Sequence, residues 1–198
     1  GMLDTNTVPI AEDITVSGAG IGIDTGVLRN YSANDVYYSG SITLDGDSTF
    51  DQEDGGMFNI SGEIGGTGDL TLVGNDPESH FDFTSNGTND YVGTTNINGV
   101  VLNLQGANDT VSIPGDININ AIDAPAQVND QRYQKISDIS RITLTQSNAS
   151  AVLRIQNGIY DTVGMIEGEG SLIIDSADSP FNVGGGDLSG TFAGSISA

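Results

Sequence analysis

The chain has 198 residues, of which 27 are acidic and 5 are lysine or arginine, so its formal net charge is −22 at pH 7. Such a field repels phosphate backbones and anionic membrane surfaces, since binding to either depends on lysine and arginine, and nucleic acid is therefore excluded as a partner. No cysteine is present, and no apolar run approaches the roughly 18 residues that a transmembrane helix needs. We expect neither disulfides nor a membrane-spanning segment.

The first 30 residues carry the weakest pattern. Residues 1–11 are polar and contain Pro9, and we expect them to form a loose end or a poorly fitted first coil. Short apolar pairs split by glycines follow over 14–28, which predicts the first strands. The 18–22 segment, Gly-Ala-Gly-Ile-Gly, superficially resembles a dinucleotide-binding loop. No helix pattern follows it, and such a loop needs a helix N-terminus for the pyrophosphate, so no cofactor site is predicted.

From residue 42 onward the chain repeats one short phrase: an apolar residue, a polar residue, an apolar residue and a turn. Successive side chains on a strand point to opposite faces, so each phrase presents an apolar face too small to bury a core by itself. Such segments fold by stacking on similar segments, which predicts a β-solenoid. Copies of the phrase begin at Ile42, Phe58, Leu70, Leu102, Ile117, Ile142, Val152 and Leu172.

A second phrase marks the start of a strand: an aromatic residue, one spacer, a glycine and then the strand. It occurs at 38–42, 91–95 and 192–196. With this phrase, Gly66–Gly74 and Tyr91–Leu104 spell Gly-x-Gly-x-Leu-Thr-Leu-x-Gly and then Tyr-x-Gly-x-Thr-x-Ile-x-Gly, followed by Val-Val-Leu-Asn-Leu. This pattern resembles the autotransporter-associated β-strand repeats of bacterial surface and secreted passenger domains.

The resemblance covers most of the chain outside the first 30 residues and 121–141. It implies an all-β fold, a single-stranded right-handed parallel β-helix. At roughly 20 residues per coil we expect nine or ten coils. We expect one domain over 1–198 with an irregular insertion or loop near 121–141, and a chain that is a fragment of a larger exported protein. The resemblance places that protein outside the cell, secreted or on the bacterial surface.

One motif bears on catalysis. Gly46-Asp47-Ser48 resembles the nucleophile phrase of GDSL-type hydrolases, and His80 is the only histidine. That family builds its site on an α/β domain, and this sequence has no helix pattern. A β-turn at 45–48 is therefore favoured over a hydrolase site.

Acidic groups bear on metal binding. The 65–69 segment, Gly-Gly-Thr-Gly-Asp, nearly spells a calcium-binding nonapeptide, but its Asp falls one position early, which turns the side chain to the other face. Looser acidic groups could hold calcium through carboxylates and turn carbonyls, although solvated acidic turns are favoured. We therefore predict no metal ligands, with calcium kept as the alternative. The looser groups are Asp45 with Asp47, Asp51 with Glu53 and Asp54, and Asp187.

The 121–141 segment breaks the pattern, because it has no glycine and contains Arg132, Lys135 and Arg141 together with Tyr133. A solenoid tolerates such a segment as a loop on one face, often the binding face. The alternative is a loop that covers the shaft and whose cations offset the acidic body; this second interpretation is favoured.

Enzymes built on a parallel β-helix need carboxylates grouped on one wall with a basic residue nearby. The acidic residues here lie mainly in turns, and Arg29, Lys135 and Arg154 are far apart in the sequence, so no catalytic residue is predicted. We expect a non-catalytic adhesin shaft or display scaffold, whose partner would be a glycan or protein on a host or neighbouring cell.

Two other function classes stay open. One is a polysaccharide-binding or polysaccharide-degrading β-helix, which would present exposed aromatic residues such as Tyr37, Tyr38 or Tyr133 beside an acidic groove. The other is a phage tail-fibre segment, which would be an obligate trimer.

Overall fold

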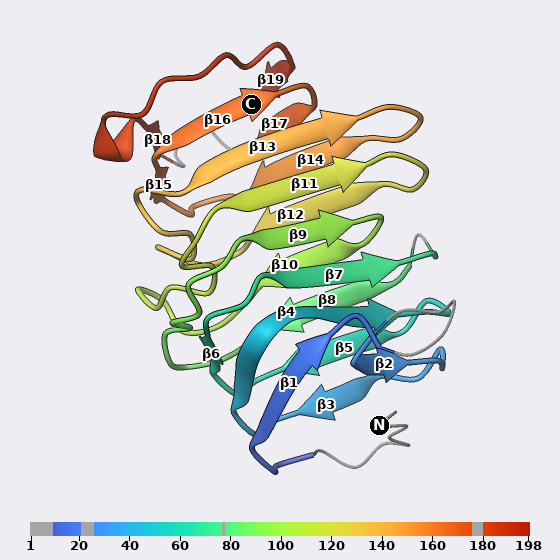
Figure 1. The fold of residues 1–198 in the computed structure, drawn as a ribbon. Helices are drawn as coiled ribbons and strands as arrows, with labels where there is room; N and C mark the ends of the chain where they lie inside the picture. Colours follow the sequence, from blue (N-terminus) through green and yellow to red (C-terminus); the bar gives the residue numbers. More distant parts are fainter. Residues whose placement is uncertain (1–9, 21–25, 77, 176–179) are drawn as a thin grey trace.

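A computed structural model describes residues 10–20, 26–76, 78–175 and 180–198 and confirms the predicted fold, a parallel β-solenoid (Figure 1). In Figure 1 the chain runs from left to right along the near sheet and from right to left along the sheet behind it. It rises from the N-terminus at the bottom to the C-terminus at the top, which makes the winding right-handed.

Two long sheets form the walls of the shaft. In the nine-stranded sheet the order is β1 (Ile14–Gly18), β4 (Ile42–Gln52), β7 (Leu70–Gly74), β9 (Thr95–Asn98), β11 (Ile117–Ala121), β13 (Arg141–Gln146) and β16 (Met165–Gly168), with β2 (Leu28–Asn30) and β6 (Ile64–Gly66) also paired to β4. The eight-stranded sheet contains β3 (Val36–Tyr38), β5 (Met57–Ile60), β8 (His80–Phe83), β10 (Val101–Leu104), β12 (Ala126–Asp130), β14 (Ala151–Ile155), β17 (Ser171–Ile174) and β19 (Ser195–Ser197).

The remaining elements are short. Strands β15 (Asp161–Val163) and β18 (Phe181–Val183) pair with each other, and residues Gly185–Asp187 form a turn of 3-10 helix. Within the described ranges, no helix has the length and apolar character needed to cross a membrane.

The solenoid makes about seven turns. The expected nine or ten coils is therefore wrong, because each coil takes more residues than the roughly 20 assumed. Asn118 bonds to Asn96 on the previous coil, 22 residues away, and Thr94 bonds to Asp69, 25 residues away. The extra residues lie in the turns, whose lengths the apolar phrase does not specify.

Inward-facing side chains of successive coils stack in columns that fill the shaft. One column of the nine-stranded sheet is Leu72, Ile97, Ile119 and Leu144, which are paired in register. The facing column in the eight-stranded sheet is Phe81, Leu102, Val128 and Leu153. All eight are buried. Isoleucine, leucine and valine dominate this core as the alternation predicts, with phenylalanine and tyrosine added.

Glycines two residues before β7, β9 and β11 lie where consecutive coils approach closely, and one of them, Gly93, belongs to the aromatic-spacer-glycine phrase. A Cβ on Gly68 would lie 1.9 Å from the carbonyl oxygen of Gly46, and one on Gly93 would lie 2.3 Å from that of Gly68. The contact repeats between Gly115 and Gly93, also at 2.3 Å. Only a residue without Cβ fits these positions. The aromatic residue before the glycine turns inward, as buried Tyr91 does.

The 121–141 segment is not an insertion throughout. Its residues 126–130 form β12, which pairs in parallel and in register with β10 and β14. The expectation of an irregular loop near 121–141 is therefore wrong for this strand. Apolar Ala126 and Val128 still alternate inward, and the absence of glycine changes only the turns on either side.

We predict that Ile97→Ala lowers the free energy of unfolding by about 2–5 kcal/mol, because it empties a space between Leu72 and Ile119 that neighbouring coils cannot close. Chemical denaturation with circular dichroism measures the change. Val92→Ala is the control, since Val92 is 77% exposed and its truncation should cost no more than about 0.5 kcal/mol. Equal losses in the two variants would contradict the stacked-core description.

Candidate functional site

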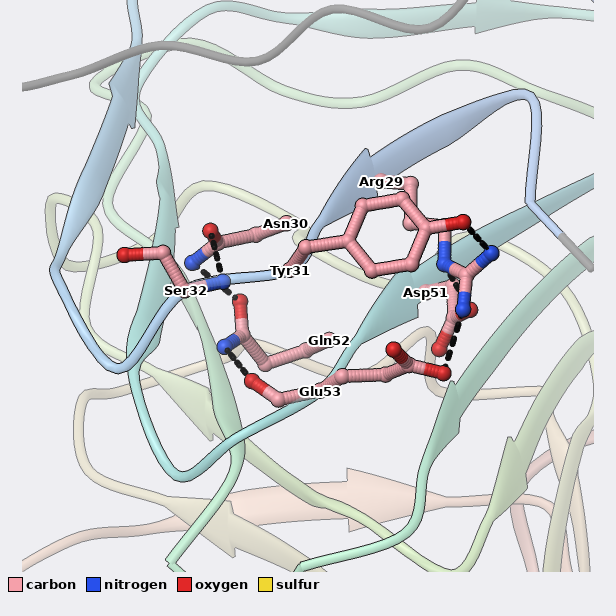
Figure 2. Close-up of polar contacts among 7 residues, drawn as sticks. All are labelled: Arg29, Asn30, Tyr31, Ser32, Asp51, Gln52 and Glu53. Carbon is pink, nitrogen blue, oxygen red and sulfur yellow. Dashed lines mark hydrogen bonds and ion pairs between the residues drawn. The ribbon is translucent and has the colours of Figure 1, made fainter. Parts of the chain in front are cut away.

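A first polar cluster surrounds Arg29, on β2 beside β4 (Figure 2). Its Nε lies 2.8 Å from Asp51 Oδ2, and its Nη2 contacts Glu53. Its Nη1 donates to the Tyr31 hydroxyl, and the guanidinium carbon lies 3.5 Å from the centroid of the Tyr31 ring. The Arg29 and Asp51 side chains are only 4% and 7% exposed, so this charge pair is largely removed from solvent.

Amides extend the cluster into the turn between the two sheets. Asn30 Nδ2 donates to Gln52 Oε1 and to the Asn34 carbonyl, each at 2.9 Å, and Gln52 Nε2 donates to the Glu53 carbonyl at 2.8 Å. Figure 2 shows these side chains directed toward one another rather than outward. The buried polar atoms bond within the turn, so this cluster fixes the path of the chain and leaves no free acid or base for chemistry.

We predict that Arg29→Ala lowers the free energy of unfolding by about 3–5 kcal/mol, because it leaves the Asp51 carboxylate buried without its cation. Arg154→Ala is the matched control. Arg154 pairs with Asp175 at 3.0 Å, but its side chain is 44% exposed, so its loss should cost about 0–1 kcal/mol. Urea titrations of both variants measure the difference, and a cost for Arg29→Ala as small as the control's would refute the buried-pair description.

A second cluster lies inside the shaft, where acids replace apolar residues. Asp130, the last residue of β12, occupies an inward column between Leu104 and Ile155. Asp161, the first residue of β15, is also fully buried. Its Oδ2 accepts hydrogen bonds from the backbone N–H groups of Lys135 and Ile136, at 2.9 and 3.0 Å.

The two buried carboxyl groups do not ionise independently of each other. Burial and the neighbouring Asp161 carboxylate raise the pKa of Asp130 far above its usual range, and burial raises that of Asp161 as well. Backbone N–H groups stabilise the charged form of Asp161. Both carboxyl oxygens of Asp130 are buried. The neutral, protonated form of Asp130 is therefore favoured at neutral pH.

Lys135 completes this cluster as a buried cation. Its Nζ donates to the carbonyl oxygen and hydroxyl of Thr110, at 2.6 and 2.7 Å, and to the Ala107 carbonyl. Burial lowers the pKa of Lys135, and the two buried acids oppose that shift. Lys135, Asp130 and Asp161 are each fully buried, so a substrate at the surface does not touch them, and their role is to hold the turn after β12.

Asp130 makes stability depend on pH. A carboxyl group whose pKa is raised on folding binds its proton more tightly in the folded state, so stability falls as pH rises above the unfolded-state pKa of about 4. We predict that Asp130→Asn, a neutral isostere, gains stability relative to the wild type between pH 5 and pH 8, by up to about 1.4 kcal/mol per pH unit. Denaturation of both proteins across this range measures the gap. A gap that does not change with pH would mean that Asp130 is ionised in the folded protein.

A third feature is an open groove of about 530 Å³ on the outer surface. It lies where β7, β9 and β11 end, at the right of the near sheet in Figure 1. The groove is lined by Gly74, Asn98, Gly99, Asn120, Ile122, Asp123 and Ala124. Unlike the fully buried Asp130 cluster, it is open to solvent.

The structure does not bring the hydrolase-like residues together. Ser48 lies in the nine-stranded sheet, where its hydroxyl donates to the Gly46 carbonyl at 2.9 Å. His80 lies in the eight-stranded sheet, with Nδ1 2.9 Å from the Glu78 carbonyl. The β-turn favoured at 45–48 is wrong, because β4 runs through these residues as a strand that pairs with β6 up to Leu44 and with β7 from Ser48, with Gly46 at φ +147° between them. Of the 18–22 segment that resembles a dinucleotide-binding loop, residues 21 and 22 lie outside the described residues.

Four of the acids considered for calcium have other partners. Asp69 and Asp47 each accept a backbone N–H bond from the adjacent coil, and Asp51 and Glu53 pair with Arg29. The Asp187 side chain lies outside the described part of the structure. Among the described residues, no three acids, histidines or cysteines gather in a way that could hold a metal ion.

The tyrosines named from the sequence do not share a groove. Tyr38 is buried, whereas Tyr37 on β3 is 41% exposed. Tyr133 follows β12, which lies four strands from β3 in the same sheet. Its ring stacks on that of Tyr160, with ring centroids 4.5 Å apart. The sequence argument missed Asp130, although the alternation of Ala126 and Val128 places residue 130 inward. It also missed the groove, whose residues come from three coils.

Comparison with protein-family models, with curated proteins and with solved structures gave no match. The autotransporter repeat family therefore stays a prediction from the sequence, and the functional argument rests on the geometry of the chain itself.

Proposed function

We propose that this chain is a non-catalytic β-helical segment of an exported bacterial protein and acts as an adhesin shaft or display scaffold. The observation that carries the proposal is the continuity of the two walls, in which each of the strands β7 to β14 pairs in register with both neighbours. Such stacking makes a rod whose stability adds up coil by coil. A rod of this kind keeps a domain at its tip at a distance from the point where the rod is anchored.

The charge distribution supports a role outside the cell and in contact with water. All five cations have partners within the chain: Arg29, Lys135, Arg141 with Glu167, Arg154 with Asp175, and Arg132, which donates to the Gln131 carbonyl at 3.0 Å. With 27 acidic residues against these five cations, the chain keeps a net charge of −22. Rods that carry the same strong charge repel one another, which keeps them soluble and separate at high local density. Localisation at the bacterial surface or in the medium is part of this proposal.

The positions of the acids favour a scaffold over a polysaccharide-degrading enzyme. Glycoside hydrolysis uses two carboxyl groups that flank a sugar in an accessible site. The closely coupled carboxyl pair identified above, Asp130 with Asp161, is fully buried in the shaft. The accessible groove has a single carboxylate among its lining residues, that of Asp123.

The scaffold function is tested by display. The chain is fused between an export signal with an outer-membrane anchor and a terminal epitope, and intact cells are probed with an antibody. We expect the epitope to be accessible and resistant to mild protease, and Ile97→Ala to reduce both signals because a weakened coil opens more often. A shaft role would be contradicted if the epitope is exported but is digested to the same extent with the wild-type chain and with Ile97→Ala.

The non-catalytic assignment has its own test. The purified chain is incubated with neutral and acidic polysaccharides, and new reducing ends or unsaturated ends are measured. We expect no product above a heat-denatured sample. Turnover that Asp123→Asn abolishes would overturn the assignment and establish glycan chemistry at the groove.

A further inference from the structure

The groove lies over a column of small residues at the same turn of three consecutive coils. A Cβ on Gly99 would lie 3.0 Å from the Gly74 carbonyl oxygen and 3.1 Å from the Ala124 Cβ. These residues therefore stack on one another within the groove lining. Asn98 and Asn120 also line the groove, together with Ile122 and Asp123, which follow β11 in the same turn as Ala124.

The two asparagines leave hydrogen-bonding groups unused. Asn120 Nδ2 donates to Asn98 Oδ1 at 2.9 Å, which leaves Asn98 Nδ2 and Asn120 Oδ1 without a partner among the described residues. If both amides were turned over, the spare donor and acceptor would change places, but one of each would still remain. A donor and an acceptor side by side are what neighbouring hydroxyl groups of a sugar require, because a hydroxyl both donates and accepts.

The sheet beside the groove repeats this chemistry from coil to coil. Two outward rows cross β7, β9, β11 and β13 in register: Thr71, Asn96, Asn118 and Thr143 form one, and Val73, Asn98, Asn120 and Thr145 form the other. Neither row contains a charged residue over these four strands, although 27 of the 198 residues of the chain are acidic. Coils stack about 4.8 Å apart, so apart from Val73 the rows offer short polar side chains at regular steps along the shaft.

We propose that the groove is a binding site for a neutral glycan, which continues from the groove along the two polar rows. Ile122, which is 54% exposed, offers apolar contact to the C–H face of a sugar ring. Exposed Asp123 offers two acceptor oxygens to hydroxyl groups. The ligand is neutral because the net charge of −22 and the Asp123 carboxylate repel anionic sugars. This site goes beyond the shaft role and does not depend on it.

The test measures binding of neutral hexasaccharides of glucose, xylose and N-acetylglucosamine to the full chain by calorimetry, and maps each contact by amide chemical shifts. We expect saturable binding of at least one of them, with shifts centred on Asn98, Gly99, Asn120 and Asp123. The double variant Asn98→Ala with Asn120→Ala should bind about tenfold more weakly, since each lost hydrogen bond reduces affinity by about two- to tenfold. Oligogalacturonate, which is anionic, should not bind.

The matched control is Asn103→Ala. Asn103 lies in an asparagine ladder on the opposite sheet, where Asn129 donates to it at 2.7 Å, so its removal should leave the affinity unchanged. Circular dichroism establishes that both variants are folded. The proposal is overturned if none of the three neutral hexasaccharides binds, if Asn103→Ala weakens binding as much as the groove variant, or if oligogalacturonate binds as well as the neutral sugars. Absence of binding leaves the scaffold proposal intact, because display and catalysis are measured separately.

Discussion

The structure depends on the close, in-register stacking of one coil on the next. Parallel backbone pairing fixes the distance between coils, so each side chain lies directly above its counterpart one coil earlier. The glycine column of Gly46, Gly68, Gly93 and Gly115 shows how tight this contact is, since a single Cβ would overlap the carbonyl oxygen of the preceding coil. The inward side chains of each coil are buried by those of the coils on either side, so the core runs along the whole shaft.

The same constraint decides how polar residues enter the interior. A polar side chain in an inward column has no water beside it, so it must find a partner within its own turn or the next. Thr95, between Leu70 and Ile117, bonds to the buried Tyr91 hydroxyl at 2.6 Å. Asp130, between Leu104 and Ile155, keeps a proton instead. Arg29 is held by two acids and a tyrosine ring. These groups fix turns, and they also explain why the strongest perturbations of charge lie away from the surface.

The outer surface separates charge from hydrogen-bonding capacity. Acidic residues lie mainly in turns, while the outward rows of β7 to β13 carry uncharged asparagine and threonine together with Val73. A rod that is acidic around its turns and neutral along one wall can stay soluble and still offer that wall to a neutral polymer. The proposed scaffold and glycan site are therefore compatible uses of one surface, and neither needs the buried acids.

The sequence by itself determined the fold class, because alternation of apolar residues and frequent glycines leave stacked strands as the way to bury a core. It also identified Tyr91 and Gly93 as parts of a recurring strand start. It did not determine the coil length, because the turns vary between coils and carry no apolar period. Without the coil length, the sequence did not reveal the proposed glycan-binding groove. Asn98 and Asn120 become neighbours only when the coil between them takes 22 residues. For the same reason Asp130 and Asp161 met only in the folded chain. Tertiary stacking, and not local pattern, decides which polar residues act together.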